Sequence, residues 1–223
     1  MFEKIKESIA RIARENTPFD PSSLNDPAAM RTDWIPLNKG GSSYRTHNLV
    51  SIGSDRLEFR ATIQAKLIYL LFLFVGIGLL IMTVFENSSY FATLISGLTF
   101  AVAGGLMLYF GTAPIVFDKR KRHFWKGSRL PIHSRNQYSR KKFAAFNEIE
   151  AIQLISKYVS SSSPDSGSGF YSNELNLVLK SGQRINVVNH GDQNRLREDA
   201  ITLSNFLKKP AWDALDNPIR HWD

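Results

Sequence analysis

Two short motifs containing acidic or histidine residues have spacings that could support acid–base chemistry. His190-Gly191-Asp192 lies where a predicted strand meets a predicted helix, and such a position can hold a catalytic pair. The simpler interpretation is that Gly191 makes the turn and Asp192 caps the helix. Glu148 and Glu150 have the spacing that places both carboxylates on one face of a strand, where paired carboxylates can exchange protons. Their simpler interpretation is a pair of solvated charges at a sheet edge.

The usual sequence signatures of catalysis and metal binding are absent. The 5 histidines form no HxxxH or HExxH pair, and the absence of cysteine excludes thiolate zinc sites, disulfides and a cysteine nucleophile. There is no GxSxG elbow or dinucleotide-binding fingerprint, and Gly40-Gly41-Ser42-Ser43 lacks the spacing of a phosphate loop. The sequence therefore predicts a protein that is not an enzyme and that holds neither a cofactor nor a metal.

The elements that must position these residues are organised around an apolar centre. Residues 66–85 and 90–112 are predicted transmembrane helices, because about 20 apolar residues cross the roughly 30 Å hydrocarbon core at about 1.5 Å per residue. The short polar connection between them turns the chain straight back, which predicts a helical hairpin. From Leu67 to Phe85 and within the second span the ionisable side chains are tyrosines, and this composition argues against ion or proton transport.

The net charge of +8 is concentrated beside the predicted hairpin. Lys and Arg flank both spans and are missing from the connection, which predicts a multi-pass protein of a bacterial inner membrane with both termini cytoplasmic. Anionic headgroups attract such residues by about 1 kcal/mol each. The residues predicted to contact the membrane surface are Lys66, Lys119, Arg120, Lys121, Arg122 and Lys126. Nucleic-acid binding is not predicted, because no basic face with interleaved aromatic residues is visible.

Small residues in the two spans are predicted to let helices pack closely. They are Gly76, Gly78, Ala101, Gly104 and Gly105. Ala101 and Gly105 form a small-xxx-small pair, and this face leaves room for a partner helix.

The remaining chain divides by composition and periodicity. An amphipathic helix, a Pro-rich linker and a β-hairpin are predicted before the spans, and a β domain with a C-terminal helix and a tail after them. Their ranges are 1–16, 17–43 and 44–63, then 115–209 and 210–223. Because the β-hairpin is marginal alone, we expect it to pair with strands that follow the membrane, so that the spans are an insertion into one β domain.

The order of patterns after the spans is similar to that of a known group of membrane proteins. The segments FNEIEAIQL, ELNLVLKSGQRINVV and LREDAITLSNFLKKP follow one another in residues 146–210. This order resembles bacterial membrane proteins with a PH-like domain just after a two-helix hairpin, and it is similar in architecture to the photosystem I assembly protein of chloroplasts and cyanobacteria. The resemblance implies a membrane α+β fold, in which a PH-like β domain is closed by a C-terminal helix, and a role in binding or assembly.

The functional hypothesis is a non-enzymatic inner-membrane protein of a Gram-negative type of cell. Its hairpin would hold a cytosolic PH-like module at the bilayer, where the module binds membrane lipid or a protein partner. One version is an immunity protein that neutralises a membrane-acting toxin. The alternatives are an assembly or scaffold factor for a membrane complex and a protein that binds lipid headgroups. An enzyme acting on lipids is disfavoured, because the sequence shows no nucleophile or metal set.

Overall fold

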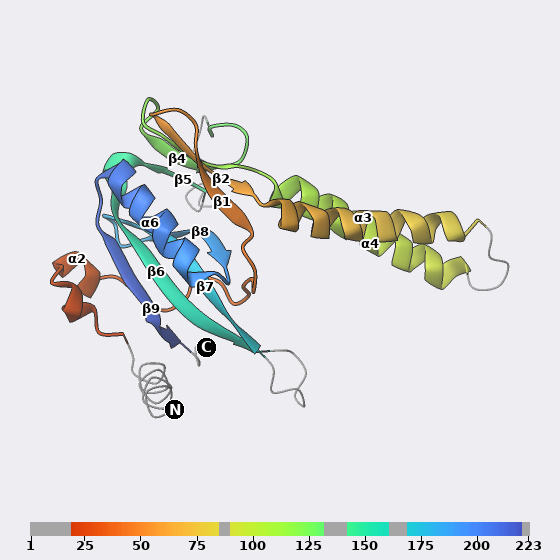
Figure 1. Ribbon diagram of the computed structural model, residues 1–223, viewed down its shortest axis with the longest axis horizontal. Coiled ribbons are helices and arrows are strands. Elements are labelled where there is room, and N and C mark those ends of the chain that lie inside the picture. Colours follow the sequence, from red (N-terminus) through yellow and green to blue (C-terminus); the bar gives the residue numbers. More distant parts are fainter. Residues whose placement is uncertain (1–18, 85–89, 132–141, 161–168, 220–223) are drawn as a thin grey trace, which may run out of the picture.

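The computed structural model of the protein describes residues 19–84, 90–131, 142–160 and 169–219. In this part of the chain, two β-sheets pack around one core, and two long helices project together from one side (Figure 1). The predicted amphipathic helix at residues 1–16, the connection between the spans and the end of the predicted tail lie outside the described residues.

The first sheet, sheet A, is antiparallel throughout and follows chain order. Its strands are β1 (His47–Ser51), β2 (Arg56–Ala61), β3 (Ile115–Asp118), β4 (His123–Lys126) and β5 (Phe143–Ala145). In β2, Leu57 and Phe59 are buried in the core. On the other face Glu58 is also buried, and it pairs with Arg56 and Arg60.

The two long helices interrupt sheet A between neighbouring strands. β2 pairs with β3 although α3 (Ile63–Met82) and α4 (Tyr90–Gly111) separate them in sequence. The side chain of Thr62 caps α3 by accepting a hydrogen bond from the Ala65 N–H at 3.1 Å. Sheet A thus contains strands from before and after the two helices, which are inserted between β2 and β3.

Both helices, of 20 and 22 residues, are long and apolar enough to cross a membrane. They pack side by side with close backbone approach at small residues. A Cβ added at Gly76 would lie 2.2 Å from the Ala101 nitrogen, and one at Gly104 would lie 2.4 Å from the Leu73 nitrogen. The contacts run in opposite directions along the two helices, so α3 and α4 are antiparallel.

The second sheet, sheet B, has the strand order β8-β7-β6-β9. Its strands are β6 (Ile149–Ser160), β7 (Gly169–Leu179), β8 (Arg184–His190) and β9 (Ala211–Ile219), and the 3-10 turn η2 (Phe146–Glu148) joins β5 to β6. The helix α6 (Gln193–Leu207) lies across the inner face of this sheet (Figure 1). Its residues Leu196, Ala200 and Leu203 are buried in the core that both sheets share. The predicted C-terminal helix is therefore present.

The segment predicted as a linker packs against the outer face of sheet B instead of connecting two elements freely. It contains η1 (Pro21–Leu24) and α2 (Pro27–Met30). In each case an aspartate N-cap precedes a proline in the first turn, where proline is tolerated because its missing N–H has no partner in a helix anyway. Residues 33–42, which we call the strap, then cross the sheet without forming a strand.

The tail also differs from the prediction. Residues Ala211–Ile219 form β9, which runs parallel to β6 at the edge of sheet B. Trp212 is only 2% exposed and packs against Trp34 of the strap. No regular hydrophobic alternation marks this segment as a strand, and the register between β6 and β9 shifts between Ile155 and Lys157.

Candidate functional site

The His190-Gly191-Asp192 motif is structural. The Asp192 carboxylate accepts a hydrogen bond from the Arg195 N–H at 3.0 Å and caps α6. Gly191 passes close to Ser43, whose carbonyl oxygen would lie 2.2 Å from an added Cβ. His190 is fully buried, and burial lowers its pKa to about 4. These contacts favour the turn-and-cap interpretation over a catalytic pair.

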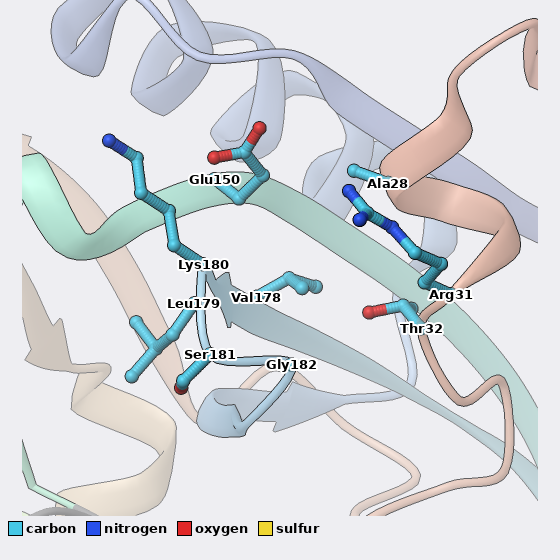
Figure 2. A pocket seen from close by; sticks show the side chains of 9 residues that line it. All are labelled: Ala28, Arg31, Thr32, Glu150, Val178, Leu179, Lys180, Ser181 and Gly182. Atoms are coloured by element: carbon cyan, nitrogen blue, oxygen red, sulfur yellow. The ribbon is translucent and has the colours of Figure 1, made fainter.

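The two glutamates of the other motif do not face each other. Glu148 accepts a hydrogen bond from the Ala145 N–H at 3.0 Å and belongs to η2. Glu150 is the second residue of β6 and lines a cavity of about 410 Å³ together with Arg31, Thr32 and Lys180 (Figure 2). The charges around this cavity are of both signs and come from open surface, so it shows no preference for one ligand chemistry.

The fold separates the basic residues that were predicted to contact the membrane. Lys66 lies in the first turn of α3, and Lys126 pairs with Ile115 just beyond α4. Residues 119–122 instead form the β3–β4 turn, at the other end of β3. Strands rise about 3.3 Å per residue, so this turn lies about 10 Å farther along the sheet than Lys126.

The predicted helix-packing residues also separate. Gly76, Ala101 and Gly104 lie at the contact between α3 and α4, whereas a Cβ added at Gly78 or Gly105 would meet nothing within 4 Å. The hairpin therefore fills the small-residue face at Gly76, Ala101 and Gly104 and leaves it open at Gly105. The contact continues at Gly97, which the sequence prediction omitted and whose added Cβ would lie 3.0 Å from Leu80.

A larger cavity of about 1190 Å³ lies where the helices leave the sheets, and we call it the hairpin-root cavity. Its walls come from the strap, the start of β1, the root of the hairpin, the end of β4 with the residues that follow, Lys142 and β8. The residues that define it include Asn38–Ser42, Thr46, His47, Tyr69, Tyr109, Phe110, Lys126–Arg129, Lys142 and Asn186–Asn189.

The charges that line the hairpin-root cavity are all basic. Lys39, Lys126, Arg129 and Lys142 contribute to its walls, and its described lining contains no Asp or Glu. Burial, with the nearby charge of Lys142, lowers the pKa of Lys126 to about 8. Burial, with the charge of Lys126, lowers the pKa of His47 to about 4. The cavity thus concentrates positive charge in a partly desolvated place, which favours an anionic ligand.

The hairpin side of this cavity is aromatic. Tyr69 comes from α3, and Tyr109 and Phe110 come from the last turn of α4. Tyr109 is 75% exposed and Phe110 is 63% exposed, so both rings remain available for an apolar contact. The cavity therefore joins a cationic wall to an apolar edge, and an amphipathic anion fits both parts.

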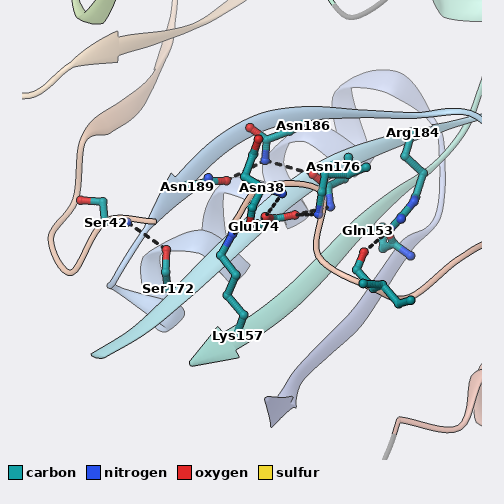
Figure 3. A network of polar contacts seen from close by, with 12 residues as sticks. Asn38, Ser42, Gln153, Lys157, Ser172, Glu174, Asn176, Arg184, Asn186 and Asn189 are labelled. Carbon is teal, nitrogen blue, oxygen red and sulfur yellow. Dashed lines mark hydrogen bonds and ion pairs between the residues drawn. The ribbon is translucent and has the colours of Figure 1, made fainter. Parts of the chain in front are cut away.

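Buried side chains of sheet B hold the strap wall of the cavity in place through hydrogen bonds (Figure 3). The Glu174 carboxylate accepts hydrogen bonds from the N–H groups of Leu37 and Asn38 at 2.9 and 3.0 Å. Ser172 accepts one from the Ser42 N–H at 3.0 Å. Because these partners are side chains, the strap follows the sheet without extending it.

A chain of amides carries this network to the β8 wall of the cavity. Asn176 donates to Glu174 at 3.2 Å, and Asn186 donates to Asn176 at 3.1 Å and to Asn189 at 2.6 Å. Asn186 and Asn189 themselves line the cavity. The two polar walls are thus parts of one hydrogen-bonded framework, which holds them in place before any ligand arrives.

No protein-family model matches this chain, and no curated protein is significantly similar to it. Within the described residues, no group of three or more His, Asp or Glu side chains is arranged to hold a metal ion. The fold and the cavity define an α+β protein with two sheets and a helical hairpin long enough to span a membrane.

Sequence reasoning identified one cationic wall residue of the cavity, Lys126, and missed the others. Lys39 was assigned to a linker, and Arg129 and Lys142 lie in or beside a basic polar segment without periodicity. The available signal was that residues 127–142, which contain Arg129 and Lys142, are basic and include no Asp or Glu. No such signal marked Lys39, because its segment also carries aspartates. Their meeting point depends on the strap and on β8, which no local pattern indicates.

Proposed function

We propose that this protein is a non-enzymatic membrane protein whose hairpin-root cavity binds the phosphate of an anionic lipid headgroup. The observation that carries the proposal is the joining of Lys126, Arg129 and Lys142 to the aromatic root of an apolar hairpin, without an acidic side chain in the described lining. Ammonium and guanidinium groups form strong charge-assisted hydrogen bonds with phosphate oxygens.

The hairpin explains why the anion would be a lipid. If α3 and α4 cross a bilayer, their root lies at the headgroup level, where tyrosines are commonly found. Tyr69 and Tyr109 occupy that level in the proposed orientation. The phosphate would enter the basic wall while the acyl chains stay beside the helices. Each basic group near an anionic surface adds about 1 kcal/mol to such binding.

The proposed location is a bacterial inner membrane, with the hairpin crossing it twice and both termini in the cytoplasm. The distribution of basic residues supports this topology, because the described part of the β domain carries them and the hairpin connection contains none. The two sheets and the helix α6 packed against them support a PH-like fold for the domain. β9 departs from the simplest version, because it continues the sheet after the helix.

Binding of a protein partner by the β domain remains a prediction from the arrangement of the chain. The two predicted forms of it are toxin immunity and assembly of a membrane complex. No residue of the hairpin-root cavity favours these roles over lipid binding.

The test is a binding titration of the full chain in an uncharged detergent by native mass spectrometry. The probes are phosphatidylglycerol, phosphatidylcholine and inorganic phosphate. We expect phosphatidylglycerol to bind at least tenfold more tightly than phosphatidylcholine, and the K126Q/K142Q variant to lose that preference. The matched control K119Q/K121Q removes two positive charges outside the cavity and should keep it.

Three results would count against the proposal. The first is equal binding of the two lipids. The second is equal loss of the preference in the two double variants, since that would reflect net charge alone. The third is tight binding of inorganic phosphate without a preference for the anionic lipid, which would indicate a site for a soluble anion.

A further inference from the structure

The basic β3–β4 turn meets the end of α6 at the side of the domain opposite the hairpin root (Figure 1). The Lys119 ammonium lies 4.2 Å from the centroid of the Phe206 ring. The Phe146 N–H donates to the Arg122 carbonyl at 2.9 Å and fixes the turn against η2. Lys208 follows two residues after Phe206 and is exposed. The fold thus gathers basic residues from two distant segments, and we call this the distal basic surface. Its members are Lys119, Arg120, Lys121, Arg122 and Lys208.

Acidic side chains neutralise only part of the positive charge of this surface. Asp55 pairs with Arg120 at 2.9 Å. Asp118 turns toward the backbone and accepts a hydrogen bond from the Lys121 N–H at 2.9 Å. The side chains of residues 119–122 are all exposed to solvent. The surface therefore keeps a net positive charge that an acidic partner can approach.

The position of the surface argues against a membrane contact in the proposed topology. The turn lies at the end of β3 that is remote from α4. With the hairpin embedded in a bilayer, this end of the sheet points away from the headgroups. The charges that the sequence predicted to touch the membrane are then available to a soluble macromolecule.

The aromatic rings of this surface argue against a single-stranded nucleic acid. Lys121 lies 5.2 Å from the centroid of the Trp125 ring, and Arg56 lies 5.5 Å from it. Trp125 is 1% exposed, so its faces cannot stack on bases, which is the main sequence-tolerant contact in such complexes. The rings instead orient the basic side chains above them.

We propose that the distal basic surface binds an acidic segment of a partner protein. Flexible acidic segments suit a surface of separate ammonium and guanidinium groups, because each carboxylate can reach its own cation. The interaction would be steered by charge, form quickly and weaken with salt. It does not depend on lipid binding in the hairpin-root cavity.

The experiment measures fluorescence anisotropy of a labelled polyglutamate peptide titrated with the full chain in uncharged detergent. We expect binding that weakens as salt increases. The variant K119E/K208E should bind at least tenfold more weakly. The control R31E/K180E changes the net charge equally at exposed positions elsewhere and should remain within threefold of the wild type.

Two outcomes would overturn the inference. One is an equal loss in both double variants, which would show attraction by net charge only. The other is tighter binding of a single-stranded DNA of the same charge that depends on Lys119 and Lys208, which would assign the surface to nucleic acid. If K119E/K208E does not fold, as judged by circular dichroism, K119Q/K208Q is measured against R31Q/K180Q under the same criteria.

Discussion

The ammonium of Lys157 and the carboxylate of Glu174 form an ion pair with a separation of 2.5 Å, and neither side chain is exposed. The pair lies under the strap on the outer face of sheet B (Figure 3). Glu174 also receives the N–H groups of Leu37 and Asn38, and the Lys157 ammonium donates to the Asn38 carbonyl. A chain segment far from the sheet in sequence is thus fixed by two buried charges.

Removing the carboxylate alone should be strongly destabilising. Glu174→Leu leaves the Lys157 ammonium buried without its charge partner and takes away the acceptor of two strap N–H groups. We expect the free energy of unfolding to fall by about 3–5 kcal/mol. The double variant K157M/E174L should lose less, because no buried charge remains. Thermal unfolding in detergent measures the stability of both variants. Glu150→Leu, at a partly exposed position, is the control. Equal stability of E174L and the wild type would contradict this account.

The elements that the sequence predicted well are those whose signals are local. The spans are uninterrupted apolar runs, the β7–β8 hairpin alternates around Ser181-Gly182, and α6 has an N-cap and a stop. Gly182 has a φ of +82°, a conformation that glycine adopts without strain. In each case the residues that determine the element are the residues that form it.

The elements that were not predicted depend on partners that are distant in sequence. The strap has no periodicity because side chains such as Glu174, 137 residues from Leu37, satisfy its backbone. β9 relies on a shifted register with β6 and on a contact between Trp212 and Trp34. The hairpin-root cavity could not be predicted from local sequence either, because the strap forms one of its walls. Local patterns carry no information about such pairings.

The hairpin contact should tolerate large side chains at some glycines and not at others. Leucine at Gly76 would collide with the Ala101 backbone, whereas leucine at Gly78 faces open space. We expect Gly76→Leu to separate α3 from α4 and Gly78→Leu to leave them together. The absence of native cysteine allows a cross-linking assay with F72C/F100C and a short bismaleimide reagent, because the rings of Phe72 and Phe100 lie 5.7 Å apart. Equal cross-linking in both leucine variants would refute the packing described.

The strap and β9 should stabilise each other through their tryptophans. The indole N–H of Trp212 donates to Asp26 at 3.1 Å, and its ring lies 6.1 Å from that of Trp34. Trp212→Ala should lower the free energy of unfolding by about 3–5 kcal/mol and make residues 20–35 sensitive to protease. Ile201→Ala, at a side chain that is 59% exposed, should do neither. Protection of residues 20–35 in W212A would show that other contacts suffice.

The stability of the fold should fall on mild acidification because of buried histidines. Burial lowers the pKa of His190 from 6.5 to about 4, with the charges of Arg45 and His47 acting in the same direction and that of Asp192 opposing them. Between these two values the unfolded chain binds a proton that the folded chain does not. The stability that His190 contributes is therefore fully present above pH 6.5 and is lost progressively as the pH falls to 4. His47, whose pKa is also lowered to about 4, adds to the loss.

Protonation of Asp199 changes the stability of the fold in the opposite direction, so Asp199 provides a comparison with His190. Burial raises its pKa from 3.8 to about 6 despite the Arg45 guanidinium at 3.2 Å, so protonation of this carboxyl favours the folded state as the pH falls below 6. We expect His190→Leu to reduce the acid-induced loss by up to about 1.4 kcal/mol per pH unit, and Asp199→Asn to make the loss steeper. At pH 7.5, H190L should be at least as stable as the wild type, because neither ring nitrogen of His190 has a hydrogen-bond partner in the described residues. Thermal unfolding between pH 7.5 and 4.5 distinguishes these slopes, and parallel curves for all three proteins would exclude His190 and Asp199 as the source of the pH dependence.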